Sequence, residues 1–351
     1  MRLSDKDPRV MMELADWEWE ELRFDYYKTD CNIRYSYTPA SGWSAMQLST
    51  DETLPVPLAA ACLHYGSALF EGLKAFRGVD GKVRIFRLED TVKRLQSSAE
   101  RLCMPVPSRE MIIEGCVEVV RRNLRHLPPY GTGAAMYLRP LEIGTSTSFG
   151  VKPSEDALFV VFASPVGPYF KGGIRPINVA INREQDRVSA HGTGDVKIGA
   201  NYAASLLPYR HARELGCSTV LFLDPQEHRF LDECVAANFF AIRDGKYITP
   251  KSETILPSIT NKTLQQVALD LGLEVEVRPI PVEEIASFEE CGCCGTGAII
   301  APIGTILDMQ TGQQVHYTDT VGSTSLALYQ RLLDIQYGVA EDVHGWNTIV
   351  E

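Results

Sequence analysis

Short runs of apolar residues, some alternating with polar ones and some continuous, predict β-strands along most of the chain. The run 82–86 alternates after a turn at Asp80-Gly81, whereas 157–163 is apolar throughout, as is typical of a strand buried on both faces. Residues 238–242 and 246–249 flank a turn that favours a hairpin. The other predicted strands are 134–140, 177–181, 219–223, 274–279 and 298–302.

Four longer segments carry apolar residues at helical spacing instead. In 88–102 these are Val92, Leu95, Ala99 and Leu102. The other three predicted helices are 109–127, which ends near Pro128-Pro129, 201–215, in which Pro208 favours a kink, and 260–271, which Gly272 closes. Because strands and helices mix without a regular strand–helix–strand alternation, the predicted fold class is α+β, an irregular α/β arrangement.

A stretch rich in proline and glycine divides the chain. Residues 165–173 lie between two predicted strands, where such residues mark a connection. We therefore expect a smaller N-terminal α/β domain over 1–164, an interdomain loop over 165–174 and a larger C-terminal domain over 175–351. A chain of 351 residues is long enough for two domains.

The charge of the chain limits its partners. A formal net charge of −11 opposes nucleic acid or an anionic membrane surface as the main partner, although a local arginine cluster can still bind anionic substrates. The first eight residues lack the apolar core of a signal peptide, acidic residues follow, and no apolar run is long enough to span a bilayer. We therefore expect a cytoplasmic protein.

Nine cysteines, an odd number, indicate small buried hydrophobic residues in a reducing compartment rather than a disulfide framework. The cluster Cys291, Cys293 and Cys294 is the exception to their scattered distribution. A zinc site would need a second ligand pair at suitable spacing, and none follows. We therefore predict close packing and no metal site there. A metal-binding module is the alternative that metal analysis would test.

The most informative segment is 192–205, where Lys197 lies between Val196 and Ile198 among glycines and other small residues. A lysine in a desolvated site loses its charge more easily and becomes a nucleophilic amine. Such an amine is what a Schiff base requires. From these residues alone, a surface lysine in a glycine-rich turn is an equally good interpretation.

Several other motifs accompany Lys197 in a fixed order. They are 64–78 and Arg94 upstream, then Tyr202, Glu233 within 231–239, the polar-capped helix start at 256–263, and Gly-Thr-Gly-Ala at 295–298. Together they resemble the class IV (fold type IV) pyridoxal-phosphate enzymes, and within them the branched-chain-amino-acid aminotransferases. The resemblance runs from about Tyr65 to Trp346 and implies the two-domain, D-amino-acid aminotransferase-like architecture.

The resemblance implies pyridoxal 5′-phosphate as the cofactor, with Lys197 as its Schiff-base lysine and as the base and acid at the substrate Cα. Tyr202 matches the tyrosine that binds the O3′ oxygen of the cofactor, and Glu233 the carboxylate beside its pyridine nitrogen. An anion there keeps the nitrogen protonated, so that the ring accepts electrons. Taken singly, Tyr202 also fits a core tyrosine and Glu233 a surface acid.

The phosphate of the cofactor is implied to bind at a helix N-terminus, where backbone N–H groups favour anions. Ile259 and Thr260 would supply these groups, Thr296 a hydroxyl, and Arg94 a charge-assisted contact. Arg187 is a weaker second candidate for this arginine. Taken alone, Arg94 also fits a solvated helix face.

On the substrate side, the resemblance implies that backbone N–H groups near Thr296, Gly297 and Ala298 hold the α-carboxylate. Tyr137 and Arg139 are implied to support that end of the site. Hydroxyl and N–H groups at the rim would let the same pocket accept glutamate.

Phe70 and Tyr65 are implied to line an apolar pocket for the side chain of leucine, isoleucine or valine. The implied reaction moves amino groups between these amino acids and 2-oxoglutarate. Tyr65 matches an aromatic residue that reaches in from the partner subunit, so at least a homodimer is expected. Ordinary core packing is the alternative for both rings.

Some positions depart from the family pattern, and alternatives stay open. Ala200 and Val235 stand where relatives usually or often have glycine, which would narrow the site. Ala298 and Ala301 occupy the positions of a Cys-x-x-Cys pair found in some relatives, so no such redox switch is expected. A D-amino-acid aminotransferase, an aminodeoxychorismate lyase and an inactive protein of the same fold are the alternatives. The segment 65–72 and the C-terminal tail favour the branched-chain group.

Overall fold

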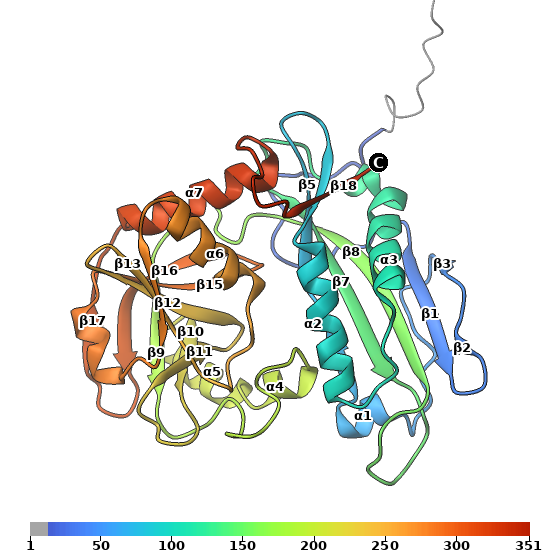
Figure 1. Ribbon diagram of the computed structural model, residues 1–351, viewed down its shortest axis with the longest axis horizontal. Helices are drawn as coiled ribbons and strands as arrows, with labels where there is room; N and C mark the ends of the chain where they lie inside the picture. Colours follow the sequence, from blue (N-terminus) through green and yellow to red (C-terminus); the bar gives the residue numbers. More distant parts are fainter. Residues whose placement is uncertain (1–12) are drawn as a thin grey trace, which may run out of the picture.

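The computed structural model describes residues 13–351, which form two large β-sheets lying side by side with helices around them (Figure 1). The first sheet has the order β18-β6-β5-β7-β8-β1-β2, with β3 paired to β1 and β4 to β7. The second has the order β11-β10-β9-β16-β15-β12-β13-β14, with β17 paired to β16. This mixed architecture confirms the predicted α+β class.

The first sheet is antiparallel and carries two long helices. Its strands are β1 (Asn32–Thr38), β2 (Gly42–Trp43), β3 (Gln47–Ser49), β4 (Ala68–Phe70), β5 (Leu73–Arg77), β6 (Val83–Phe86), β7 (Ala135–Gly144), β8 (Ala157–Val166) and β18 (Asn347–Val350). The helices are α1 (Ala61–Tyr65), α2 (Leu88–Arg101) and α3 (Arg109–Arg122). Val92, Leu95 and Ala99 of α2 are buried in the core, as their spacing predicts. Together α2 and α3 cover one face of this sheet (Figure 1).

The second sheet closes on itself. Its strands are β9 (Ile177–Asn182), β10 (Thr219–Leu223), β11 (Leu231–Cys234), β12 (Ala237–Arg243), β13 (Lys246–Pro250), β14 (Glu274–Arg278), β15 (Glu290–Gly295), β16 (Ile299–Asp308) and β17 (Gln314–His316). Because β11 pairs with both β10 and β12, strands β9, β10, β11, β12, β15 and β16 form a closed ring. Phe239 and Ala241 belong to one core cluster, and the alternate residues Phe240 and Ile242 to another.

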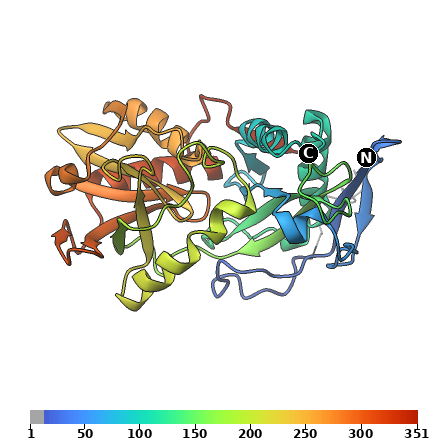
Figure 2. The same ribbon diagram turned by 90° about the horizontal axis from the view of Figure 1, so that it is seen from below.

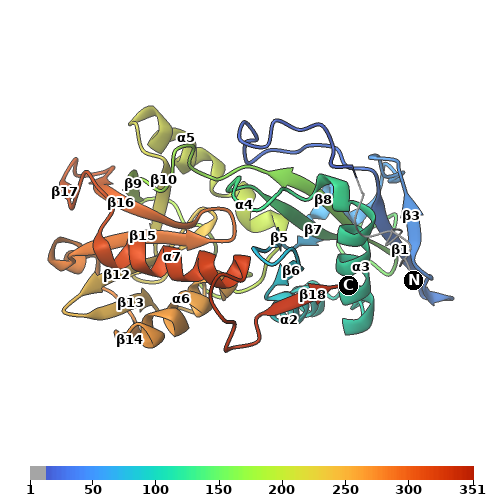
Figure 3. The same cartoon turned by 90° about the horizontal axis from the view of Figure 1, so that it is seen from above.

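Four helices surround this ring. They are α4 (Gly199–Ala203), α5 (Leu206–Glu214), α6 (Ile259–Asp270) and α7 (Ser323–Tyr337). Helices α6 and α7 pack together on one side, and α5 contacts β9 and β10 on another (Figure 3). In residues 13–351, no helix is long and apolar enough to cross a membrane.

Several predicted boundaries need correction. The single helix expected over 201–215 is two helices, because the chain turns at Ala204 and Ser205 between α4 and α5. The interruption lies four residues before Pro208, where a proline removes the hydrogen bond to the carbonyl of residue i−4 and its ring clashes with that carbonyl. The kink expected at Pro208 is thus present as a break between two helices. The helix expected over 109–127 ends at Arg122 and continues only as a short 3-10 turn, Leu124–His126.

The hairpin prediction is confirmed, because β12 and β13 pair antiparallel across Asp244-Gly245. The chain passes from β8 of the first sheet to β9 of the second through an irregular segment (Figure 2). At its C-terminal end it returns, and β18 pairs with β6 of the first sheet. The hydrophobic pattern gave no sign of this return. The division at 165–174 stays a prediction.

Candidate active site

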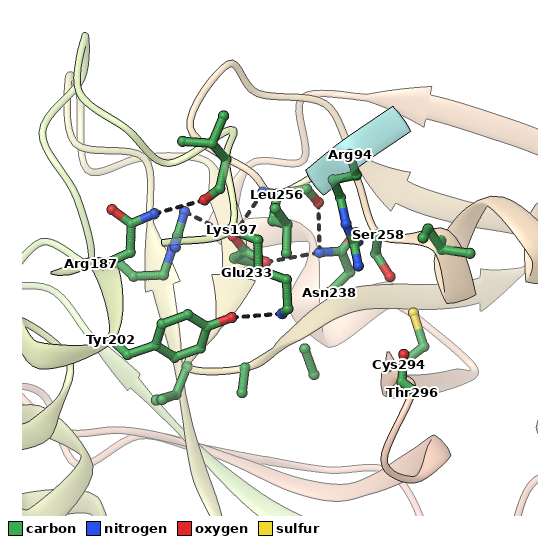
Figure 4. A pocket seen from close by; sticks show the side chains of 17 residues that line it. Arg94, Arg187, Lys197, Tyr202, Glu233, Asn238, Leu256, Ser258, Cys294 and Thr296 are labelled. Carbon is green, nitrogen blue, oxygen red and sulfur yellow. Dashed lines mark hydrogen bonds and ion pairs between the residues drawn. The ribbon is translucent and has the colours of Figure 1, made fainter. Parts of the chain in front are cut away.

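Two adjoining cavities lie where the two sheets face each other. The first, which we call the polar cavity, measures about 50 Å³ and is lined by Arg94, Arg187, Glu233 and Asn238 among others (Figure 4). The second, the aromatic cavity, measures about 440 Å³. Its rings and polar groups include Phe24, Phe70, Tyr137, Arg139, Tyr169 and Tyr209. The two cavities share Lys197, Tyr202, Val235, Ala236, Ala237, Gly295 and Thr296.

Lys197 lies at this junction, in the loop before α4. Its backbone N–H donates to the Ser98 hydroxyl at 3.0 Å, and its carbonyl accepts from the Phe70 N–H at 3.2 Å. The loop of the second half of the chain is therefore anchored to the first sheet and to α2. The Lys197 amine donates to the Tyr202 hydroxyl at 2.9 Å and lies 4.9 Å from the centre of the Phe70 ring. The structure thus brings Lys197, Tyr202 and Phe70 together.

Glu233 is buried in the wall of the polar cavity, with 4% of the residue exposed. One carboxylate oxygen pairs with Arg187 at 2.8 Å and accepts from the Leu256 N–H at 2.9 Å. The other accepts from Asn238 at 2.8 Å. Burial raises the pKa of Glu233 to about 7, and the Arg187 charge and the Leu256 N–H oppose this rise. The structure therefore excludes the alternative of a surface acid.

Arg187 had been a second candidate for binding phosphate, but its guanidinium is engaged elsewhere. Besides Glu233, it donates to the carbonyl oxygen of Thr254. The side chain is buried, with 6% exposed. An arginine held between a carboxylate and a carbonyl oxygen acts on the charge of Glu233, and its role as a second candidate for the cofactor phosphate stays a prediction.

The N-terminus of α6 borders the polar cavity. Ser258 is its N-cap and accepts from the Asn261 N–H at 3.2 Å. The Asn261 side chain donates to Asn238 at 3.1 Å and to Thr249 at 2.8 Å, which fixes the helix start against the sheet. Ser258 and Ile259 line the polar cavity. Thr260, one residue further, lines a smaller neighbouring cavity instead.

Arg94 extends from α2 into the polar cavity rather than lying on a solvated face. It donates to both carboxylate oxygens of Glu71, at 2.7 and 2.8 Å, and to the Pro257 carbonyl at 3.1 Å. Glu71 is fully buried. The sequence pattern did not assign Glu71 a role, although an acidic residue in the run 68–73 between apolar neighbours was the available signal.

Tyr137 and Arg139 lie side by side on β7 and face the aromatic cavity. Arg139 donates to the Tyr137 hydroxyl at 3.2 Å, and its guanidinium lies 4.6 Å from the centre of the Phe70 ring. A side chain at Gly72 would place its Cβ 1.9 Å from the Tyr137 hydroxyl oxygen, so this glycine makes room for the tyrosine. Phe24 packs edge-on against Tyr137 at 5.3 Å between ring centres. The sequence pattern did not assign Phe24 to the lining of this cavity.

The loop 295–298 borders both cavities and is held by two hydrogen bonds to the segment 72–74. The Thr296 hydroxyl donates to the Gly72 carbonyl at 3.2 Å, and the Lys74 amine donates to the Gly297 carbonyl at 2.8 Å. Burial lowers the pKa of Lys74 to about 8. Ile299, next after the loop, has φ of +63°, a strained conformation for a branched residue. Lys74 belongs to the motif 64–78, but nothing in the sequence pattern predicted its contact with this loop.

The departures from the family pattern also lie near the junction. Val235 lines both cavities. The Ala200 methyl group would lie 3.5 Å from a Cβ at Gly66, which is ordinary contact. Ala298 and Ala301 line the aromatic cavity. Neither Ala200 nor Val235 removes a polar group from the site.

The cysteine cluster lies on β15, where alternation separates its members. Cys291 and Cys293 belong to one core cluster and Cys294 to another. The Cys293 sulfur lies 3.2 Å from that of Cys234. A Cβ at Gly292 would lie 2.5 Å from the Phe240 ring, so packing is close here, as expected. Over residues 13–351, no group of three or more His, Cys, Asp or Glu residues has a metal-binding arrangement.

Besides Thr260, Tyr65 is a predicted site residue that lines neither the polar nor the aromatic cavity. It ends α1, with 38% of the residue exposed. Its hydroxyl donates to the Phe149 carbonyl. The structure thus rules out core packing within this chain as its role.

Comparisons with known proteins agree with this arrangement. The family model for class IV aminotransferases matches residues 68–306, more than half of the chain. A branched-chain-amino-acid aminotransferase of Helicobacter pylori is 43% identical over 339 residues, covering 96% of this chain and 98% of the relative. One from Haemophilus influenzae is 42% identical over 348 residues, covering 96% of this chain and 100% of the relative.

Solved structures show the same likeness. A branched-chain amino acid aminotransferase of T.th., determined with pyridoxamine 5′-phosphate, has a TM-score of 0.78 and 27% identity, covering 92% of this chain and 100% of that one. The Escherichia coli enzyme gives 0.76 at 26% identity with the same coverage. The chain therefore belongs to the class IV aminotransferases and, among them, to the branched-chain-amino-acid aminotransferases.

Proposed function

We propose that the protein transfers the amino group between L-leucine, L-isoleucine or L-valine and 2-oxoglutarate, with pyridoxal 5′-phosphate as its cofactor. The products are the branched-chain 2-oxo acids and L-glutamate. The position of Lys197 carries the proposal, because its amine lies where a polar cavity meets an aromatic one. The family relationship supports the same reaction.

The residues around the polar cavity fit this cofactor. Arg94 and the N-terminal turn of α6 offer a cation and N–H groups, which suit a phosphate. Glu233 offers a buried carboxylate, which suits a protonated ring nitrogen. Arg94 and Ser258 lie together on one side of Figure 4, and Arg187 lies on the other. When bound, the cofactor supplies an aldehyde that joins an amine and a ring that accepts an electron pair.

Each residue then has a defined task in the transfer. With the cofactor bound, the Lys197 amine would take the proton from the substrate Cα and deliver it to the cofactor carbon that bears the nitrogen. In the second half of the exchange it would move a proton the opposite way. The Tyr202 hydroxyl, 2.9 Å away, orients that amine. Glu233 holds a proton at the ring nitrogen, and the Arg187 charge favours the ionised form of Glu233. The N–H groups of the loop 295–298, with Tyr137 and Arg139, receive the substrate carboxylates.

The visible spectrum of the cofactor-loaded protein tests this function. We expect the cofactor band to shift on adding L-leucine, and 2-oxoglutarate to restore it while a branched-chain 2-oxo acid accumulates. D-leucine serves as the matched control and should leave the band in place. A response to D-leucine alone would favour a D-amino-acid aminotransferase, and no response to either would contradict the proposal.

We also propose that each site is completed by a second copy of the chain, in at least a homodimer. Tyr65 lies on α1, near strongly exposed apolar side chains on α1, on the segment before it and on the loop after β7, namely Leu58, Leu63, Phe149 and Val151. An isolated bridge between Ala60 and Thr147 joins the two segments. An exposed apolar surface of this kind is typical of an interface, and a two-fold arrangement uses one surface for both sites.

A mixing experiment tests this assembly. A Lys197→Ala protein and a Tyr65→Ala protein are combined under conditions that allow subunit exchange. One site of each heterodimer then carries both changes and the other carries neither, so activity should rise above that of either parent. A monomer that is active in sedimentation experiments would exclude the assembly and the role of Tyr65.

We further propose a cytoplasmic location. All nine cysteines are free in the structure, which is typical of proteins from a reducing compartment. Cell fractionation, with activity measured in each fraction, tests this location.

A further inference from the structure

A further cavity lies beside the aromatic cavity, and its lining carries positive charge without an ion-pair partner in the part of the chain that the structure describes. We call it the arginine vestibule. It measures about 540 Å³, and its polar lining consists of Tyr169, Arg175, Asn178, Tyr209, Arg213 and Ser218. Tyr169, Ile177, Tyr209 and Ser218 also line the aromatic cavity, so the two spaces adjoin at these four residues.

The two arginines come from different elements that are fixed relative to each other. Arg175 precedes β9, and Arg213 lies in the last turn of α5, one turn after Tyr209. Helix α5 packs against β9 and β10 (Figure 3). The Ser218 N–H donates to the Asn178 carbonyl at 2.7 Å. This hydrogen bond links β9 to the residue before β10, and both residues line the vestibule.

The charge of the vestibule contrasts with that of the protein. The chain has a net charge of −11, yet no acidic residue lines this cavity. Within residues 13–351, neither Arg175 nor Arg213 forms an ion pair, whereas their neighbour Arg210 pairs with Glu214 at 3.9 Å. A cation near a helix C-terminus also stabilises the helix, which would explain Arg213 but not Arg175.

We propose that the arginine vestibule favours the doubly charged substrate of the exchange over the branched-chain one. This inference rests on the proposed function. A five-carbon dicarboxylate such as 2-oxoglutarate carries two negative charges, a branched-chain 2-oxo acid one, and a branched-chain amino acid none overall. Two guanidinium groups without an ion-pair partner among the described residues, in a cavity that adjoins the aromatic one, raise the local concentration and binding of the dianion most.

The field of these arginines reaches the aromatic cavity, because the two cavities adjoin and share four lining residues. The bound dianion is therefore stabilised as well as the entering one, and the effect falls on KM. Salt screens exposed charges over about 10 Å at an ionic strength of about 0.1 M. The preference must therefore weaken as salt is added.

The test uses the cofactor-loaded enzyme with Arg175→Gln and Arg213→Gln combined. At an ionic strength of about 0.02 M, we expect KM for 2-oxoglutarate to rise roughly three- to tenfold. KM for 4-methyl-2-oxopentanoate should change less than about twofold, with kcat unchanged for both. The difference between the changes in KM for the two 2-oxo acids should disappear at about 0.3 M salt. Arg210→Gln on the same helix is the matched control and should change neither KM.

A second readout keeps the inference testable if the double variant folds poorly. Calorimetry measures the binding of glutarate and of 4-methylpentanoate, which lack a reactive carbonyl group, to the parent and to the Arg175→Lys, Arg213→Lys protein. Glutarate should bind the parent and the double Lys protein with similar affinity, because both keep the positive charges. It should bind more weakly to the Arg175→Gln and Arg213→Gln single variants, each of which loses one charge. If the Gln variants lost affinity equally for both ligands, or for neither, the proposed preference of the vestibule for the dianion would be wrong.

The two proposals fail in different ways. If the parent enzyme transaminates both 2-oxo acids and the variants leave their KM ratio unchanged, only the vestibule is wrong. If the parent enzyme does not transaminate, the proposed function is wrong, and glutarate binding still decides whether the vestibule selects dicarboxylates.

Discussion

The polar and aromatic cavities share one lysine but are held in opposite ways. Both arginines that line the polar cavity are paired with a buried carboxylate, Arg94 with Glu71 and Arg187 with Glu233. In the aromatic cavity, the walls include six aromatic rings. The Arg139 guanidinium lies over the Phe70 ring, and its Nε atom has no hydrogen-bond partner in the described part of the chain. The second space is also much larger, about 440 Å³ against about 50 Å³.

This contrast matches what each cavity has to hold. A cofactor has one shape and fixed charges, so paired buried groups can be set in advance for it. Amino acids that differ in side chain require a wall that accepts an aliphatic chain or a carboxylate. Aromatic rings and an arginine with a free N–H provide such a wall. Changes in the polar cavity should therefore affect the cofactor and turnover, and changes in the aromatic cavity should affect KM.

Glu233→Gln should have the largest effect among the supporting residues. A neutral amide cannot hold a proton at the ring nitrogen, so we expect kcat to fall on the order of 10²-fold while the cofactor still binds. The neighbouring buried Asp232, whose carboxylate accepts from Thr254, provides the control Asp232→Asn, which should lose far less. A Glu233→Gln enzyme with kcat within a few-fold of the parent would separate Glu233 from the ring nitrogen.

Arg94→Gln should weaken the affinity for cofactor. Loss of a charge-assisted contact costs about 1.5–3 kcal/mol, which is roughly ten- to a hundredfold in Kd. Excess cofactor should restore most of the activity. Because Glu71 would be left buried without a charged partner, the double variant with Glu71→Gln is the control for stability. An unchanged Kd for cofactor in both proteins would place the phosphate elsewhere.

Arg139→Gln should act on the substrate alone. We expect KM for glutamate and 2-oxoglutarate to rise about tenfold, with a smaller change for leucine. The Kd for cofactor, measured by spectral titration, should match that of the parent. A matching loss of cofactor affinity would show that the two cavities are not separate in function.

Glu142→Gln should give the smallest effect, and it concerns stability. Glu142 lies on β7 with both carboxylate oxygens buried and unpartnered, and burial raises its pKa to about 8. The unfolded chain has a glutamate pKa of about 4.3. The contribution of Glu142 to stability is thus fully present below that value and is lost as pH rises through about 8.

Denaturant melts at several pH values test this difference. Between the two pKa values, the free energy of unfolding of the parent should fall relative to the Glu142→Gln protein by on the order of 1 kcal/mol per pH unit. Glu114→Gln, a change at a carboxylate that accepts from Tyr35, is the control. Parallel curves for parent and Glu142→Gln would show that Glu142 is ionised throughout.

The sequence predicted the local elements well where period and turn residues agreed. The helix 88–102 and the hairpin at Asp244-Gly245 were found at these positions. Long-range features escaped it, because nothing local specifies them. The pairing of β18 with β6 joins residues far apart in sequence, and the closure of the ring by β11 depends on a two-residue contact with β12.

The site shows the same division. Motif order pointed to Lys197 and Tyr202, and the structure brings them within hydrogen-bond distance. The residues that hold other residues in place were missed. Glu71 acts on Arg94, and Lys74 acts on the loop at Gly297. Their meaning depends on partners that only folding places beside them.

The attachment of the cofactor to one amine tests the central claim most directly. The protein is loaded with pyridoxal 5′-phosphate, reduced with borohydride, digested, and mapped by peptide mass. We expect one label, on Lys197, and no label in the Lys197→Ala protein. Lys74 is the informative rival, since it is buried nearby and its pKa is lowered to about 8. A label on Lys74, or a retained label in the Lys197→Ala protein, would contradict the account.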